Sequence, residues 1–75
     1  MVRGSKMATG RQVRAARAAL KLTVRELAER AGVSPNTVVR IESDQGVNPS
    51  TVTVLRMALE KEGIVFSDTG IDFTA

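Results

Sequence analysis

The chain of 75 residues contains no cysteine, histidine, tryptophan or tyrosine. These absences exclude thiol nucleophiles, imidazole bases, disulfides and the soft ligands of most transition-metal sites. A domain of this size buries only about 60% of its unfolded surface, which leaves little room for a catalytic pocket. We therefore expect a protein that is not an enzyme and that uses no metal or other cofactor.

Long apolar runs are also missing. No stretch approaches the roughly 20 residues that a membrane-spanning helix needs, and the start of the chain lacks the apolar segment of a signal sequence. These two features predict a cytoplasmic protein that has no membrane partner.

Positive charge is concentrated in the first half of the chain. The net charge is +3, but residues 3–30 carry eight basic residues against two acidic ones, whereas the remainder carries three basic against six acidic. A basic half favours a polyanionic partner, although solvated helix faces show similar patterns.

Two capping boxes mark helix starts in this basic half. In Thr9-Gly-Arg-Gln12 and Thr23-Val-Arg-Glu26, the first and last side chains satisfy each other's backbone amides. Apolar residues at helical spacing follow each box, and a glycine ends the second helix. We expect helices over about 10–20 and 24–31, with these residues facing inwards: Val13, Ala16, Leu20, Val24, Leu27, Ala28 and Ala31.

Two further helix starts combine a capping residue with proline. Ser34-Pro35 and Asn48-Pro49 place a preferred N-cap before the residue best suited to the first helical position. They predict a helix from about residue 34 to 43 and another that Gly63 closes. The expected inward residues are Val38, Ile41, Val52, Leu55, Ala58 and Leu59.

The last twelve residues change to a period of two. Ile64-Val-Phe66 and Ile71-Asp-Phe73 predict two short strands around a turn. An isolated hairpin is marginally stable in water, so this one must pack on the helices or on a second chain. The predicted fold is mainly α, with four to five helical elements and a short C-terminal β-hairpin. Residues 1–8 are expected to form a flexible arm, which is either natural or left over from expression. Residues 9–63 are expected to form a helical domain, and residues 64–75 a β tail.

A tight glycine turn joins two short helices in the run Leu22-Thr-Val-Arg-Glu-Leu-Ala-Glu-Arg-Ala-Gly-Val-Ser-Pro-Asn-Thr-Val-Val-Arg-Ile-Glu42. This run resembles the phage repressor and Cro (XRE-type) family of helix-turn-helix regulators, and the resemblance extends over about residues 9–63. It implies a lambda-repressor-like fold. It also implies a sequence-specific regulator of transcription, more often a repressor, that inserts the helix at about 34–43 into the major groove of double-stranded DNA.

The resemblance further implies which residues contact the edges of the bases. Because Val38 and Ile41 are needed inside, Asn36, Val39 and Arg40 fall on the opposite side of the helix. An arginine there can donate two hydrogen bonds to guanine, and an asparagine can pair with adenine. The alternative for each is an ordinary solvated position, and a threonine hydroxyl can also bond back to a helix carbonyl. The predicted base-reading set is Ser34, Pro35, Asn36, Thr37, Val39 and Arg40.

Contacts to phosphates need basic side chains or helix N-terminal amides. The candidates are Arg11, Arg14, Lys21 and Arg25, with ordinary solubilising charge as the alternative. Arg17 falls among the inward residues, and the resemblance implies that it pairs with Glu42. Asp44, in the loop where the family often carries a basic residue, is expected to repel a phosphate.

Relatives usually bind two half-sites as dimers. We therefore expect a homodimer on an inverted-repeat operator, joined through the hairpin residues Ile64, Phe66, Ile71 and Phe73. The alternative role of the hairpin is to cover the last helix within one chain. An alternative function is a protein-interaction module, such as an antitoxin or anti-regulator that retains the fold. RNA binding is disfavoured, because single-strand readers stack bases on aromatic side chains and this chain has only two.

Overall fold

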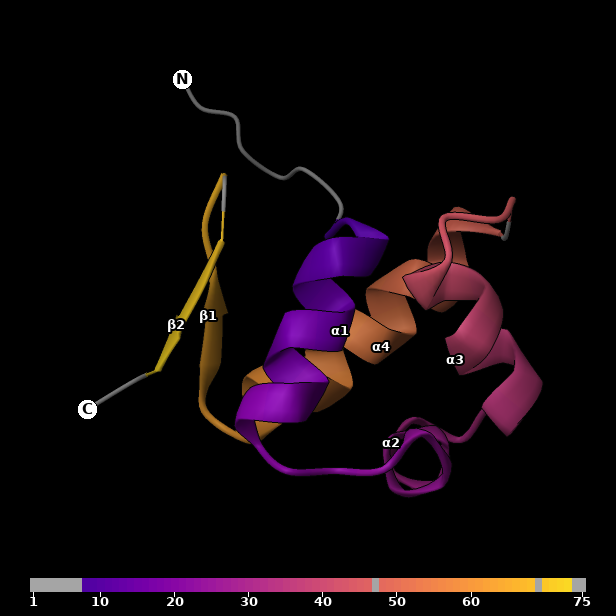
Figure 1. The fold of residues 1–75 in the computed structure, drawn as a ribbon, viewed down its shortest axis with the longest axis horizontal. Helices are drawn as coiled ribbons and strands as arrows, with labels where there is room; N and C mark the ends of the chain where they lie inside the picture. Colours follow the sequence, from indigo (N-terminus) through magenta and orange to yellow (C-terminus); the bar gives the residue numbers. More distant parts are fainter. Residues whose placement is uncertain (1–7, 47, 69, 74–75) are drawn as a thin grey trace.

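The computed structural model describes residues 8–46, 48–68 and 70–73. Four helices are followed by a two-stranded antiparallel sheet, as the sequence predicts (Figure 1). The longest axis of the molecule has α3 at one end and the hairpin at the other. The elements are α1 (Gly10–Ala19), α2 (Val24–Ala31), α3 (Pro35–Glu42), α4 (Pro49–Lys61), β1 (Ile64–Phe66) and β2 (Ile71–Phe73).

Each helix begins at the capping residue that the sequence indicates. Thr9 and Thr23 both form complete capping boxes, and Ser34 and Asn48 accept a backbone N–H in the first turns of α3 and α4. Gly32 ends α2 with φ 74°, a left-handed conformation that costs glycine little. The helix starts and the turn between α2 and α3 are therefore specified by neighbouring residues.

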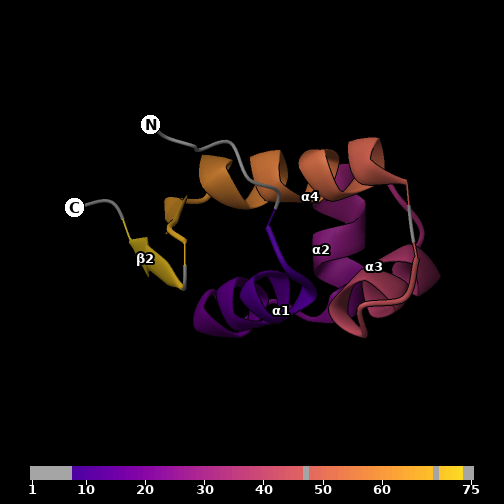
Figure 2. The same cartoon turned by 90° about the horizontal axis from the view of Figure 1, so that it is seen from above.

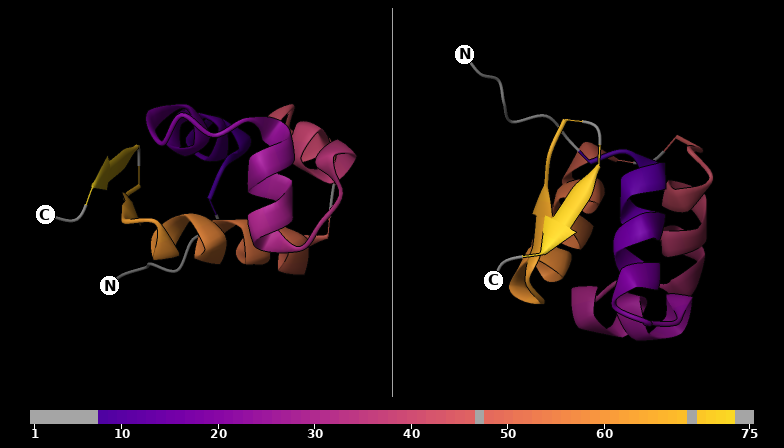
Figure 3. Two further views of the ribbon diagram at one scale, coloured as in Figure 1. Left: turned by 90° about the horizontal axis from the view of Figure 1, so that it is seen from below. Right: turned by 60° about the vertical axis from the view of Figure 1, so that its left-hand side comes forward.

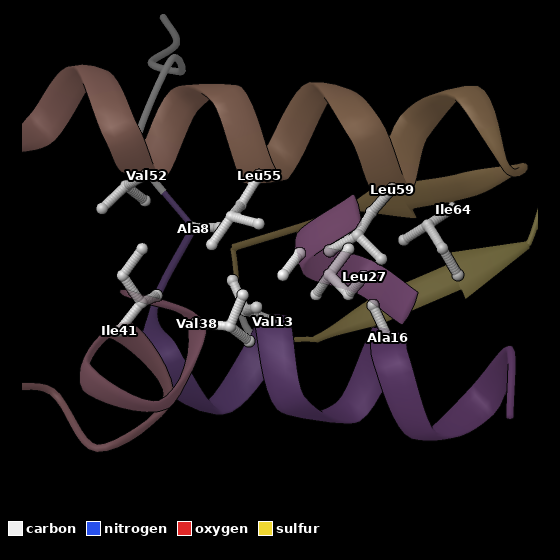
Figure 4. Close-up of a cluster of buried hydrophobic side chains, with 11 residues drawn as sticks. Ala8, Val13, Ala16, Leu27, Val38, Ile41, Val52, Leu55, Leu59 and Ile64 are labelled. Atoms are coloured by element: carbon white, nitrogen blue, oxygen red, sulfur yellow. The ribbon is translucent and has the colours of Figure 1, made fainter. Parts of the chain in front are cut away.

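One continuous apolar cluster lies between α4 and the other three helices. Figure 4 shows Val52, Leu55 and Leu59 directed from α4 towards α1, with Leu27 and Val38 beside them. The largest side chains in it are almost fully buried, and each stabilises the fold by roughly 2 kcal/mol. The full cluster is Ala8, Val13, Ala16, Leu27, Ala28, Val38, Ile41, Val52, Leu55, Leu59 and Ile64.

Ala8 packs in the core, although the sequence analysis placed it in the N-terminal arm. It is only 8% exposed. A single methyl group carries too little pattern to reveal this burial from the sequence. The remainder of the predicted arm, residues 1–7, lies outside the described residues.

The hairpin packs on its own chain. β1 and β2 pair antiparallel, with Ile64 opposite Phe73 and Phe66 opposite Ile71, so these four side chains share one face of the sheet. The strands contact α4 and α1 (Figure 3), and Ile64 is buried in the core. Arg56 of α4 also lies over the ring of Phe66, 5.6 Å from its centroid.

None of the described helices is long and apolar enough to cross a membrane. Nor do the described residues include a cluster of three or more acidic, cysteine or histidine side chains that could hold a metal ion.

Candidate nucleic-acid interface

The two sides of α3 differ sharply in exposure. Val38 and Ile41 are 0% and 3% exposed and anchor the helix in the core. Val39 is 46% exposed, and Asn36 and Arg40 are exposed as well. The structure therefore places Asn36, Val39 and Arg40, three of the six residues predicted to read bases, on one solvent-facing side of a helix held from behind.

The first turn of α3 is fixed by its own hydroxyl groups. The Ser34 Oγ accepts the Thr37 N–H at 3.2 Å and lies 2.9 Å from the Thr37 Oγ1. Pro35 follows at the first helical position and adds no N–H that would need a partner. Asn36 makes no side-chain hydrogen bond to any described residue, so its amide is the polar group in this turn that is left to interact with a ligand.

Arg40 lies one turn further along α3 and leans towards the following loop. Its Nη2 donates to the carbonyl oxygen of Gly46 at 3.2 Å, and the side chain stays exposed. A guanidinium has five N–H donors, so this single bond leaves the group able to make a two-point contact elsewhere.

An ion pair fixes the end of α3 to α1. The Arg17 Nε donates to Glu42 Oε2 at 2.7 Å, and its Nη2 donates to Glu42 Oε1 at 3.0 Å. The hydrogen bond with this carboxylate raises the pKa of Arg17, against the opposing effect of burial. Its Nη1 also donates to the carbonyl of Leu22, between α1 and α2. The partners that the sequence predicted thus lie in direct contact, and Arg17 points inwards.

Asp44 connects the loop after α3 to the start of α1. Its backbone has φ 58°, and its Oδ1 accepts the Gly10 N–H at 3.3 Å. A carboxylate there is favoured by the partial positive charge at a helix N-terminus. The sequence indicated only a group that repels phosphate; the structure gives Asp44 a role in bracing α3 against α1.

The close approach of these two helices depends on Gly10. A Cβ atom at this position would lie 2.2 Å from the carbonyl oxygen of Ile41 and 2.8 Å from Asp44 Oδ1. The α1 N-terminus and the α3 C-terminus can therefore meet only because position 10 has no side chain.

The basic side chains divide into two groups. Arg17, Arg30 and Arg56 form ion pairs with Glu42, Glu62 and Glu60, respectively. The four predicted phosphate ligands are all exposed, and in the part of the chain that the structure describes none of them forms an ion pair: Arg11, Arg14, Lys21 and Arg25. Most of the uncommitted positive charge therefore lies on α1, on the start of α2 and in the connection between them; Arg40 on α3 and Lys61 on α4 are the other basic residues outside an ion pair in the described part of the chain.

The N-terminus of α2 is neutralised by its own first turn. The carboxylate of Glu26 accepts the Thr23 N–H at 2.8 Å, and this bond lowers the pKa of Glu26. The end of the helix is thus occupied by an internal anion. A phosphate near α2 would have to be held by the side chains of Lys21 or Arg25.

Most of the residues predicted for dimerisation are packed against other parts of their own chain. Ile64 is 2% exposed, Phe66 and Ile71 are half-buried, and Phe73 is 53% exposed. Of these four, only Phe73 offers most of its side chain to a partner. The hairpin therefore packs on α4, as the alternative interpretation expected, and also on α1 of the same chain.

Gln12 fixes the hairpin, a role that the sequence did not predict beyond its place in the first capping box. Its Nε2 donates to the carbonyls of Ser67 and Gly70 at 2.6 and 2.9 Å, while its Oε1 accepts the Thr9 N–H. It is 8% exposed. Its place four residues before Ala16 was the available signal, because that spacing puts it on the buried face of α1.

Comparison with known proteins accounts for this architecture. A helix-turn-helix family model matches residues 13–60, well over half of the chain. The chain belongs to the XRE-type helix-turn-helix family. It therefore carries a DNA-binding domain of the kind found in transcription regulators. The matched region contains α2 and α3 in full and ends before the hairpin. A comparison with curated proteins gave no match.

Proposed function

We propose that this helix-turn-helix protein is a transcriptional repressor that inserts α3 into the major groove and binds an inverted repeat as a homodimer. The proposal rests on one observation: α3 presents exposed side chains to solvent while the helix itself is held rigidly. Asn36, Val39 and Arg40 face solvent on a helix whose far end is tied to α1 through Glu42 and Asp44. A major groove about 12 Å wide admits a helix presented in this way.

The roles of the three outward residues follow from their chemistry. Arg40 exchanges its bond to the Gly46 carbonyl for the O6 and N7 acceptors of a guanine. Asn36 donates to N7 and accepts from N6 of an adenine, and Val39 contacts a thymine methyl. Ser34, Pro35 and Thr37 shape the first turn and approach the same groove by van der Waals contact.

Phosphate contacts supply affinity that does not depend on sequence. Arg11, Arg14, Lys21 and Arg25 are free to make them, because none is held by an ion pair among the described residues. Repression is the mode favoured for this arrangement, since occupying an operator blocks polymerase without any further contact by the protein.

Selection from random duplexes tests the proposal. Repeated binding and sequencing at low salt should enrich a palindromic motif with two identical half-sites. Absence of enrichment would overturn the proposal and favour a protein-interaction module instead.

A further inference from the structure

Two apolar residues lie on neighbouring turns of the outward side of α3. Pro35 and Val39 are four residues apart, a spacing that places them on the same helix face and about 6 Å apart along the axis. Pro35 is exposed, and Val39 is 46% exposed. These two residues are called the apolar row below.

The apolar row runs beside the polar residues that we propose to read bases. Asn36 and Arg40 are also four residues apart, and each follows one member of the apolar row along the chain, so the two rows are parallel. The helix lies at one end of the long axis of the molecule, and the hairpin lies at the other (Figure 2). A duplex whose bases contact Asn36 and Arg40 therefore also meets the apolar row.

The backbone and hydroxyl groups around the apolar row are largely satisfied within the first turn. The Ser34 Oγ accepts the Thr37 N–H and lies 2.9 Å from the Thr37 Oγ1. Pro35 has no N–H to donate. What the row presents to a base pair is therefore hydrocarbon, and its partner must be an apolar group.

The C5 methyl group is the apolar group that a base pair carries in the major groove. Thymine has this methyl group and 5-methylcytosine has it at the same position, whereas uracil and cytosine carry hydrogen there. The ring of Pro35 is rigid, and a valine in a helix strongly prefers one rotamer. The apolar row thus keeps its shape, and contact with a methyl group costs it little conformational freedom.

We propose that the apolar row binds the C5 methyl group of a pyrimidine and thereby distinguishes 5-methylcytosine from cytosine. The inference rests on the proposed function and extends it from one thymine contact to the methylation state of the DNA. Burying one methyl group strengthens binding about four-fold. Methylation of a cytosine that faces the row in an operator therefore increases occupancy of the site.

Replacing thymine by uracil isolates the methyl group, because every hydrogen-bonding group of the base stays. Each thymine of the selected half-site is replaced in turn, and affinity is measured for the parent, Val39→Ala and Met57→Ala. Alanine favours a helix at the exposed position 39, so the first variant keeps its fold. Met57 is 57% exposed on α4 and provides the matched control for loss of an exposed apolar side chain.

We expect one thymine per half-site whose replacement weakens binding about four-fold in the parent and in Met57→Ala. The same replacement should not weaken binding of Val39→Ala, which has already lost the contact. If no thymine shows this loss, or if Val39→Ala shows it in full, the proposal is wrong.

Methylated cytosine provides the second measurement. The thymine found in the first experiment is replaced by cytosine or by 5-methylcytosine, each paired with guanine, so that the two duplexes differ only in the methyl group. The parent should bind the methylated duplex about four-fold more tightly, and Val39→Ala should bind both equally. Equal binding of the two duplexes by the parent would overturn the inference and leave the proposed function intact. A selection that enriches no motif would instead disprove both.

Discussion

Arg17 on α1 and Glu42 at the end of α3 form a two-point ion pair in which the glutamate side chain is 8% exposed. This pair joins α3 to the rest of the domain, while the Nη1 of Arg17 also donates to the Leu22 carbonyl. Replacing Arg17 by Met leaves a nearly buried carboxylate without its partner. We expect a loss of about 3 kcal/mol in the free energy of unfolding, measured by urea denaturation with an unchanged m-value.

The double variant isolates the pair itself. Arg17→Met combined with Glu42→Gln should be less destabilised than the sum of the single changes, because no uncompensated charge remains. Additive single changes, or a loss below about 1 kcal/mol for Arg17→Met, would show that the pair contributes little.

Gly10 should resist a substitution that is normally favourable in helices. Alanine is ordinarily about 1 kcal/mol better than glycine within a helix. At position 10, however, its Cβ would lie 2.2 Å from the Ile41 carbonyl oxygen. We expect Gly10→Ala to lower the free energy of unfolding by about 1 to 3 kcal/mol. Gly46→Ala is the matched control, since a Cβ there meets no atom within 4 Å. Equal stability of the two variants would show that α1 and α3 need not approach so closely.

Gln12→Glu tests whether one amide holds the hairpin. The change keeps an acceptor for the Thr9 N–H and removes both donors to the carbonyls of Ser67 and Gly70. The Gly70 carbonyl keeps the Ser67 N–H and Oγ as donors, but the Ser67 carbonyl loses its donor from Gln12. A partly buried carbonyl left unpaired costs about 1 to 3 kcal/mol. Hydrogen exchange should therefore accelerate in β1 and β2 and remain slow in α2 and α4. Uniform acceleration across the chain would mean that the hairpin and the helices unfold as one unit.

Glu26 should make stability depend on pH in the acidic range. Its pKa is lowered from 4.5 because the Thr23 N–H donates to the charged carboxylate. A group whose pKa is lower in the folded state stabilises the fold above its unfolded pKa, and this contribution is lost as the pH falls through the folded pKa. Glu26→Gln keeps the capping box without titrating.

The free energy of unfolding of the parent, relative to Glu26→Gln, should therefore decrease between pH 6 and pH 3. Glu29→Gln makes the same charge change at an exposed position of the same helix and controls for net charge. A constant difference between parent and Glu26→Gln over this range would contradict the capping role of the carboxylate.

The helices and strands were predictable because their signals are local. Capping boxes, Ser-Pro and Asn-Pro starts and Gly32 act on neighbouring backbone groups, so the sequence alone locates the element starts closely. The buried residues followed from periodicity for the same reason. The pair Arg17 and Glu42 was reached through family resemblance, since nothing local connects two residues on different helices.

The contacts that the sequence did not reveal all join distant segments. Gln12 contacts the turn of the hairpin, and Asp44, after α3, contacts Gly10 at the start of α1. Each residue also has an ordinary local interpretation: Gln12 ends a capping box, and Asp44 is an acidic residue in a loop. These interpretations concealed their contacts with distant segments. The placement of the hairpin was undecided for a similar reason, because alternation shows which face is apolar and not what covers it.

The most direct test of the role of α3 is to measure the base preference of the Arg40→Ala variant. On duplexes derived from the selected motif, we expect this variant to lose about 1 to 3 kcal/mol and to relax the preference at one base pair of each half-site. Lys21→Ala is the comparison: it should weaken all duplexes alike and reduce the salt dependence by about one charge. If Arg40→Ala instead weakens every duplex equally, or leaves the preference intact, α3 does not read the major groove as described.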